Sequence, residues 1–194
     1  MIVVTGPEVL VNFTDDPADA DELAEVAAAT FPLACPPDLS AGDVAQFIAT
    51  SLSGHHFRRY LSQPDHHVLK ATDSASDAIV GYALLIDSEP DDTDVLAAIP
   101  ERPLTMVSKL YVLPGFHGGA VSATLMSAAL AHAAERGSAR IWLGVNEQNR
   151  RAQRFYEKMG FTIVGRKSFV VGGKTCSDYV LARTPPPTAD LPET

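Results

Sequence analysis

The stretch YVLPGFHGGAVSATLM, from Tyr111 to Met126, passes from an apolar strand to a helix through a turn that holds three glycines. Glycines at such a turn let the backbone approach a ligand closely, and the first turn of a helix presents unpaired N–H groups and a partial positive charge. Phosphate is therefore a natural ligand here. The spacing fits neither the P-loop pattern nor the dinucleotide pattern G-x-G-x-x-G, and glycines that only relieve a tight turn are the alternative.

Apolar periodicity predicts further strands and helices on both sides of this stretch. Strands are predicted over residues 9–13, 66–72, 79–87, 106–113, 139–145, 161–171 and 175–183. Helices are predicted over residues 18–30, 42–52, 56–64, 119–136 and 149–159. The proline-bounded, acidic segment 88–103 is predicted to be a loop, and the prolines of segment 31–40 are predicted to break helix. This order of elements predicts an α/β fold with a mixed sheet.

Length and composition favour one globular domain over residues 1–183, followed by a disordered, proline-rich tail over residues 184–194. No Lys or Arg precedes Arg58, so a signal peptide is not expected, and no apolar run reaches the roughly 18 residues of a membrane span. A cytoplasmic protein without a membrane partner is therefore predicted. Cys35 and Cys176 lack C-x-x-C spacing, which argues against a disulfide scaffold or a structural zinc site.

The net charge of −9 disfavours nucleic acid as a partner, but the charge is unevenly placed. Residues 1–107 carry 4 basic and 18 acidic side chains, whereas residues 108–194 carry 11 basic and 6 acidic ones. An anionic ligand bound by the second half and a cationic one nearer the first half would produce this asymmetry. A solvated acidic surface would produce it as well.

The second half of the chain also carries a family likeness. The segment NRRAQRFYEKMGF, residues 149–161, matches the pattern N-x-x-A-x-x-F-Y-x-K-x-G-F. Together with LYVLP, HGGAVS and IWLGV, it resembles the GNAT superfamily of N-acetyltransferases, over residues 108–183. The segments IWLGVNEQN and GRKSFVVGGKTCSDYVLAR are similar to the PaiA-type branch, which acetylates polyamines. The resemblance implies an α/β (α+β) fold with a mixed, mostly antiparallel, twisted sheet of about six or seven strands flanked by helices.

The resemblance further implies that acetyl-CoA is the cosubstrate and lies in a cleft between two parted parallel strands. Pro114 and the polar turn from Asn146 to Asn149 agree with strands that separate at this place. Asn149 is expected to cap its helix, to bind pantetheine, or both. The residues expected to bind the coenzyme are Leu110, Tyr111, Val112, His117, Gly118, Gly119, Ala120, Val121, Ser122, Asn149, Ala152 and Tyr156.

The sequence departs from the family in two places. His117, Ala120 and Ser122 stand in a phosphate loop that usually reads Q/R-x-x-G-x-G/A, although backbone N–H groups at a helix N-terminus still suit a pyrophosphate. Ser108 stands where the family often has a carboxylate. For the general base, Glu147 beside the expected cleft is the leading candidate. Asp178 and the acidic loop at Asp91, Asp92 and Asp94 are the alternatives.

Tyr156 is expected to be the general acid, because a phenol with a reference pKa of about 10 is matched to a departing thiolate. An aromatic core residue is the alternative, and of the neighbours Phe155 and Tyr156 only one is expected to reach the cleft. The basic residues Arg150, Arg151 and Arg154 could meet coenzyme phosphates, or could be ordinary solvated charges.

No metal site is predicted. The adjacent pairs His55-His56 and His66-His67 do not converge easily on one ion, and no Cys, Asp or Glu spacing completes a ligand set.

The predicted function is acetyl transfer from acetyl-CoA to a primary amine of a small molecule by direct attack in a ternary complex, with polyamines favoured. The alternatives are acetylation of a protein Lys or N-terminus, and a catalytically weak GNAT module that binds acyl-CoA. The sequence is compatible with a homodimer.

Overall fold

The structure is a computed structural model that describes residues 8–35, 39–116, 120–171 and 174–188. Seven strands form one sheet in the order β1-β2-β3-β4-β5-β7-β6, and all neighbouring pairs are antiparallel except β4 and β5. This confirms the predicted mixed, mostly antiparallel sheet. The strands are β1 (Val9–Thr14), β2 (His66–Asp73), β3 (Ile79–Ile86), β4 (Leu104–Val112), β5 (Arg140–Asn146), β6 (Thr162–Val171) and β7 (Lys174–Arg183).

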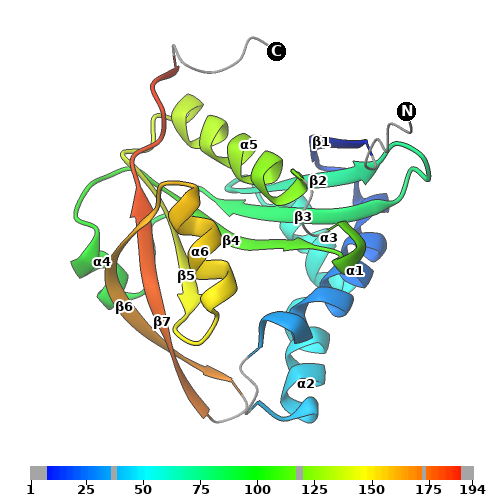
Figure 1. Cartoon of the computed structure of the whole chain (residues 1–194), viewed down its shortest axis with the longest axis horizontal. Helices are drawn as coiled ribbons and strands as arrows, with labels where there is room; N and C mark the ends of the chain where they lie inside the picture. Colours follow the sequence, from blue (N-terminus) through cyan, green and yellow to red (C-terminus); the bar gives the residue numbers. More distant parts are fainter. Residues whose placement is uncertain (1–7, 36–38, 117–119, 172–173, 189–194) are drawn as a thin grey trace, which may run out of the picture.

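Six helices cover the two faces of the sheet (Figure 1). They are α1 (Ala20–Ala34), α2 (Ala41–Ser51), α3 (Gly54–Ser62), α4 (Thr93–Ala98), α5 (Val121–Glu135) and α6 (Arg150–Lys158). Strand residues alternate between the faces, so that Leu84 packs with α1 and α3 while Leu85 packs with α5. No helix within the described residues is long and apolar enough to cross a membrane.

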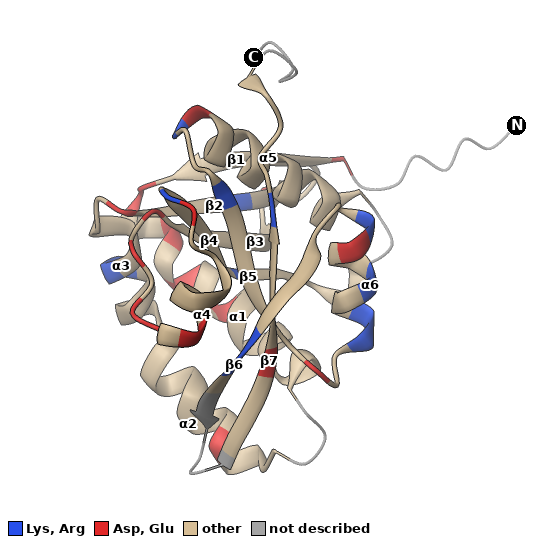
Figure 2. Cartoon of the chain, turned by 90° about the vertical axis from the view of Figure 1, so that its left-hand side faces the viewer, with Lys and Arg blue, Asp and Glu red and all other residues tan. Residues whose placement is uncertain are grey.

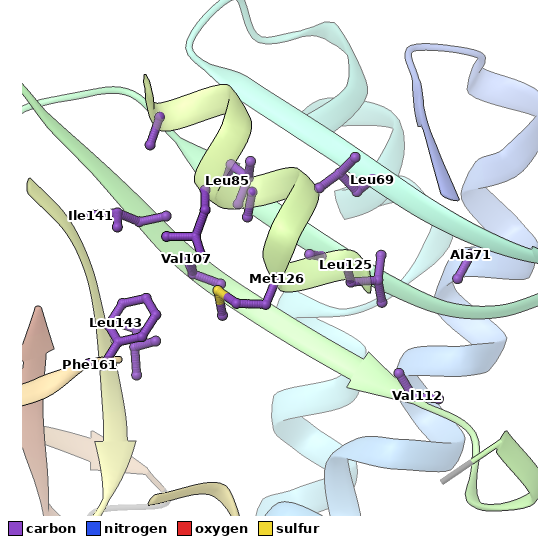
Figure 3. Close-up of a cluster of buried hydrophobic side chains, with 14 of the residues drawn as sticks. Leu69, Ala71, Leu85, Val107, Val112, Leu125, Met126, Ile141, Leu143 and Phe161 are labelled. Atoms are coloured by element: carbon purple, nitrogen blue, oxygen red, sulfur yellow. The ribbon is translucent and has the colours of Figure 1, made fainter. Parts of the chain in front are cut away.

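The largest buried cluster lies between α5 and the sheet (Figure 3). Leu125 and Met126 of α5 are fully buried in this cluster, and Met126 points toward Val107 of β4 and Leu143 of β5. Apolar side chains at this spacing hold α5 across the sheet. The helix N-terminus is thereby fixed near the end of β4.

Two elements differ from the prediction. Helix α1 continues past Thr30 to Ala34, with Pro32 inside its last turn. A proline there removes one hydrogen bond near the helix end, and the packing of Phe31 against Phe47 of α2, with ring centroids 4.6 Å apart, supports the turn.

The segment predicted as a loop over residues 88–103 contains α4. Asp92 caps this helix by accepting hydrogen bonds from the backbone N–H groups of Asp94 and Val95. Val95 and Ile99 are buried against Trp142. The acidic and proline-rich composition of the segment predicted a loop, but its short apolar run, Val95 to Ala98, folds as a helix because tertiary contacts stabilise it.

The structure describes only the first part of the tail that was predicted to be disordered, residues 184–194. Residues 184–188 follow β7, and Pro185 is buried. Residues 189–194 lie outside the described part, so the predicted disorder of the tail stays a prediction.

Replacing Leu125 by Ala should lower the free energy of unfolding by about 2–5 kcal/mol, because it opens a cavity between α5 and the sheet. Ser127→Ala, at an exposed position of the same helix, is the control and should change it by less than about 0.5 kcal/mol. Urea denaturation followed by circular dichroism measures both. Equal stability of the two variants would contradict the packing described here.

Candidate functional site

The two parallel strands at the centre of the sheet pair over only three residues each. The register joins Leu104 to Arg140, Thr105 to Ile141 and Met106 to Trp142. Beyond these pairs the described residues of β4 and β5 do not pair with each other, although β4 stays paired with β3 up to Val112. Figure 1 shows the two strands diverging. The parted strands expected from the resemblance are therefore present.

A cavity of about 610 Å³ opens where the strands part. Its walls come from β4, β5 and β7, from the C-terminal end of α1, from Phe47 of α2, from the first turn of α5, and from one side of α6. Seven of the expected coenzyme-binding residues line it: Leu110, Tyr111, Val112, Ser122, Asn149, Ala152 and Tyr156. Val121 is instead buried in the core beneath α5, and Ala120 is exposed at the helix N-cap. His117, Gly118 and Gly119 lie outside the described residues.

The N-terminus of α5 opens onto this cavity. Ser122 and Ala123 of its first turn line the wall, and none of the side chains that the structure describes caps the helix at Ala120. The N–H groups of a first helical turn carry a partial positive charge, so this end of the cavity suits an anionic group.

Helix α6 supplies the opposite wall at the same end. Asn149 is its N-cap, and its Oδ1 accepts a hydrogen bond from the Ala152 N–H at 3.0 Å. The expected capping role of Asn149 is thus confirmed. Gln153 donates to the carbonyls of Asn146 and Glu147, which holds the turn before the helix.

The basic residues of α6 form a charged outer surface (Figure 2). Of the three arginines, Arg151 lines the cavity, whereas Arg150 and Arg154 are exposed and do not. Arg151 is therefore the arginine of this group that a molecule in the cavity could contact.

Two neighbouring aromatic side chains of α6, Phe155 and Tyr156, both line the cavity. Sequence reasoning expected only one of them, since consecutive helical residues point about 100° apart, but the cavity is wide enough to contact both. Burial raises the pKa of Tyr156 to about 12, and it also raises the pKa of Tyr111 across the cavity. Among the described residues, none forms a hydrogen bond with the Tyr156 hydroxyl.

A β-bulge in β4 determines which side chains face the helices α1 to α3. Leu85 pairs with Val107 and Leu84 with Lys109, which leaves Ser108 as the extra residue of the bulge. Lys109 then lies on the side of α3, where its Nζ sits 5.0 Å from the centroid of the Tyr60 ring. Burial lowers the pKa of Lys109 to about 8.

Asp178 of β7 is the carboxyl group in the cavity wall. Its side chain is buried, and its Oδ1 accepts no hydrogen bond from a described residue. Burial raises the pKa of Asp178 to about 6, although the positive charge of Lys167 and a hydrogen bond from Asn146 act to lower it. A Cβ atom at position 144 would lie 3.2 Å from Asp178 Oδ2, so Gly144 leaves the room that this carboxyl group occupies.

The leading sequence candidate for the base, Glu147, lies just outside this wall. Its Oε1 is 3.2 Å from Nε of Arg166, and it does not line the cavity. The acidic residues Asp91, Asp92 and Asp94 lie at the N-terminal end of α4, and none of them lines the cavity.

A separate polar cluster centres on Asp87. Its Oδ2 lies 2.8 Å from His132 Nε2, 3.2 Å from Arg136 Nε and 3.2 Å from His67 Nε2, while Oδ1 accepts a hydrogen bond from Thr105. Although burial raises its pKa, the bonds from His132 and Thr105 hold the pKa of Asp87 below its usual value. His67, Asp87 and His132 have the ligand types of a metal site, but Arg136 already supplies a cation to the carboxylate.

Sequence reasoning missed several residues that the fold brings into the cavity. Lys109 could have been noticed as a charged residue within an apolar strand. The helix residues Phe31 and Phe47 and the two cysteines, Cys35 and Cys176, carried no comparable signal, because only the packing of α1 and α2 over β4 and β7 places them there.

Comparison with known proteins agrees with this geometry. Residues 34–161 match the model of the acetyltransferase (GNAT) family. The chain is 48% identical over 165 residues to uncharacterized N-acetyltransferases of Mycobacterium tuberculosis and Mycobacterium bovis, covering 85% of this chain and 97% of each relative.

Solved structures share the fold. The PaiA N-acetyltransferase from Thermoplasma acidophilum, in complex with coenzyme A, superposes with a TM-score of 0.70 at 18% identity, over 90% of this chain and 99% of that one. Arabidopsis thaliana NAA60, in complex with a bisubstrate analogue, superposes with a TM-score of 0.66 at 16% identity, over 90% and 98% of the two chains. The chain therefore belongs to the GNAT family, as an N-acetyltransferase whose cosubstrate is acetyl-CoA.

Proposed function

We propose that the enzyme transfers acetyl from acetyl-CoA to a primary amine of a small molecule by direct attack in a ternary complex. The observation that carries this proposal is the cavity between β4 and β5, whose lining includes both the first turn of α5 and Asp178 on β7. A thioester and an amine bound at its two ends meet where the strands part. Such positioning supplies much of the rate enhancement for a reaction between two substrates.

In this reaction the amine nitrogen attacks the thioester carbonyl carbon, and a tetrahedral intermediate with an oxyanion forms. Its collapse forms the amide bond, breaks the carbon–sulfur bond and releases coenzyme A as a thiolate. The nitrogen must lose a proton and the sulfur must gain one, so a base and an acid on opposite sides of the reacting carbon are favourable.

Asp178 suits the role of the base. At neutral pH a carboxyl group with a pKa of about 6 is mostly ionised, yet it binds a proton more readily than an ordinary aspartate. Its unpaired Oδ1 leaves an acceptor for an amine proton. Glu147, the leading sequence candidate, is paired with Arg166 and stays the alternative.

Tyr156 suits the role of the acid. Its raised pKa keeps the phenol protonated until the thiolate develops, and burial raises the pKa of a departing thiol in the same cavity for the same reason. The N-terminus of α5, with Arg151 nearby, is the proposed position for the pyrophosphate.

The acceptor is proposed to be a small molecule because residues of α1 and α2, Phe31 and Phe47 among them, form the cavity wall on the side away from α5. Polyamines, favoured by the C-terminal resemblance, stay a prediction. Asp178 is the one acidic residue among those described that line the cavity, and the acidic residues near α4 lie elsewhere. A cytoplasmic location also stays a prediction.

Release of free thiol from acetyl-CoA, measured over a panel of polyamines, amino acids, aminoglycosides and peptides, tests the proposal. At least one small amine should support turnover well above the rate of hydrolysis without acceptor. Turnover confined to peptides would assign a protein acceptor instead. Coenzyme binding without release for any acceptor would favour a binding module.

The pH profile of kcat/KM should rise through a limb near pH 6, because Asp178 must lose its proton to act as a base. Asp178→Asn should abolish this limb and lower kcat by about 100-fold or more, in line with the usual contribution of a general base. The pH profile of Glu147→Gln is measured for comparison. Loss of the limb in Glu147→Gln, with the limb retained in Asp178→Asn, would restore Glu147 as the base.

Tyr156→Phe should lower kcat by about 100-fold while leaving the dissociation constant of coenzyme A within about threefold, since it removes only the proton donor. Calorimetric titration with coenzyme A and steady-state rates measure the two effects. Phe155→Leu, in the same wall, is the control for altered packing and should not change kcat by more than a few fold. An unchanged kcat in Tyr156→Phe would rule out Tyr156 as the acid.

A further inference from the structure

The acceptor side of the cavity contains a lysine that has no counter-ion among the residues that the structure describes. The ammonium of Lys109 contacts the Ser108 hydroxyl at 3.3 Å and the face of the Tyr60 ring. None of the carboxylates that the structure describes pairs with it, and burial alone accounts for its lowered pKa. Lys109 is nevertheless among the residues that line the cavity, next to Ser108, whose hydroxyl its ammonium contacts.

An ammonium in this position is unfavourable in the empty enzyme. Removing a charge from water is costly unless an opposite charge or several hydrogen bonds replace the water, and here neither is present among the described residues. Unpaired charges of this kind are concentrated at functional sites. An anionic group on the ligand would give Lys109 the partner that the chain does not provide.

The bulge at Ser108 decides on which side of the sheet this charge lies. Leu110 and Val112 pack toward α5, whereas Lys109 and Tyr111 face the layer of α1 to α3. The proposed phosphate position, at the N-terminus of α5, is on the other face. Lys109 is therefore directed toward the acceptor rather than toward the coenzyme phosphates.

The rest of the acceptor side has two further properties. Asp178, on β7 across the parted strands, is the acidic group in the wall. Helices α1 and α2 add apolar surface, with the stacked rings of Phe31 and Phe47 and with Leu33, whose side chain is 62% exposed. Among the described residues, Lys109, the Asp178 carboxyl group and the aromatic wall are together complementary to an amine that also carries a carboxylate and an apolar body.

We propose that the acceptor is an amino acid with an apolar or aromatic side chain, held by an ion pair between its carboxylate and Lys109 while its amino group lies at Asp178. This rests on the proposed function, since it specifies the acceptor of the same reaction. A polyamine would bring additional positive charge to Lys109, and like charges in a poorly solvated site repel. The N-terminus of a peptide lacks the free α-carboxylate.

Matched pairs of acceptors test the proposal in the wild-type enzyme. L-Phenylalanine is compared with phenethylamine and with L-phenylalaninamide, and L-leucine with its decarboxylated amine and its amide. An ω-amino acid and its matched alkylamine extend the series, and spermidine is included. At least one amino acid should show a kcat/KM about 10-fold or more above its carboxylate-free partners, the gain expected of a charge-assisted contact. A preference for the carboxylate-free member of every pair, or for spermidine, would overturn the proposal.

Lys109→Met removes the charge while keeping an unbranched side chain. It should lower kcat/KM for the preferred amino acid by about 10- to 100-fold, mainly through KM, and leave the matched amine within about threefold. Lys158→Met, at an exposed position of α6, controls for a general loss of positive charge and should change neither. An equal loss of kcat/KM for the amino acid and for its matched amine would show that Lys109 does not bind the carboxylate.

A binding measurement separates this proposal from the proposed function. Calorimetry of the coenzyme A complex with an N-acetylated apolar amino acid, the expected product, needs no turnover. Binding that Lys109→Met weakens about 10-fold or more would support the carboxylate contact even if no acceptor releases thiol. If the wild-type enzyme does not bind this product, or if wild type and Lys109→Met bind it equally well, the proposed amino-acid acceptor is overturned. Acetyl transfer to other amines would remain intact. If Lys109→Met does not fold, Lys109→Gln takes its place, and the wild-type comparison decides independently.

Discussion

The separation of β4 and β5 is the constraint on which the rest of the site depends. A backbone N–H or C=O group in a sheet is normally paired with the next strand, and leaving it unpaired in a buried place is unfavourable. Here pairing between the two central strands ends at Met106 and Trp142, although both strands continue. The fold thus keeps a row of backbone groups available at its centre, and a bound ligand is what can satisfy them.

The two faces of the sheet contribute different chemical groups to this opening. On one face, α5 and α6 bring a helix N-terminus and Arg151 to the cavity, which suits the anionic coenzyme. On the other face, α1 and α2 bring apolar rings, and the sheet itself contributes Lys109 and Asp178. In the proposed reaction, the acetyl group passes between the faces at the point where the strands part.

Much of the fold was accessible from sequence because its signals are local. The apolar periodicity of α5, the capping Asn149 and the glycine turns after the helices predicted the second half almost element by element. Helix α4 and the last turn of α1 were missed, since tertiary packing stabilises them against their composition.

The site was harder to predict than the fold, because cavity walls combine residues that are distant in sequence. Tyr156 and Asn149 could be named from a motif within one helix. Asp178 could only be offered among several carboxylates, and the bulge that places Lys109 on the side of α3 has no sequence signature. Likewise, His67 meets Asp87 and His132 only because β2, β3 and α5 are neighbours in space.

The most direct measurement of the central claim is the change in backbone amide chemical shifts of the isotope-labelled enzyme on addition of coenzyme A. If the coenzyme lies between the parted strands, the amides of residues 107–111 of β4 and of the first turn of α5 should shift most, while residues 104–106, already paired with β5, should change little. Shifts confined to other surfaces, with residues 107–111 unaffected at saturation, would contradict the account.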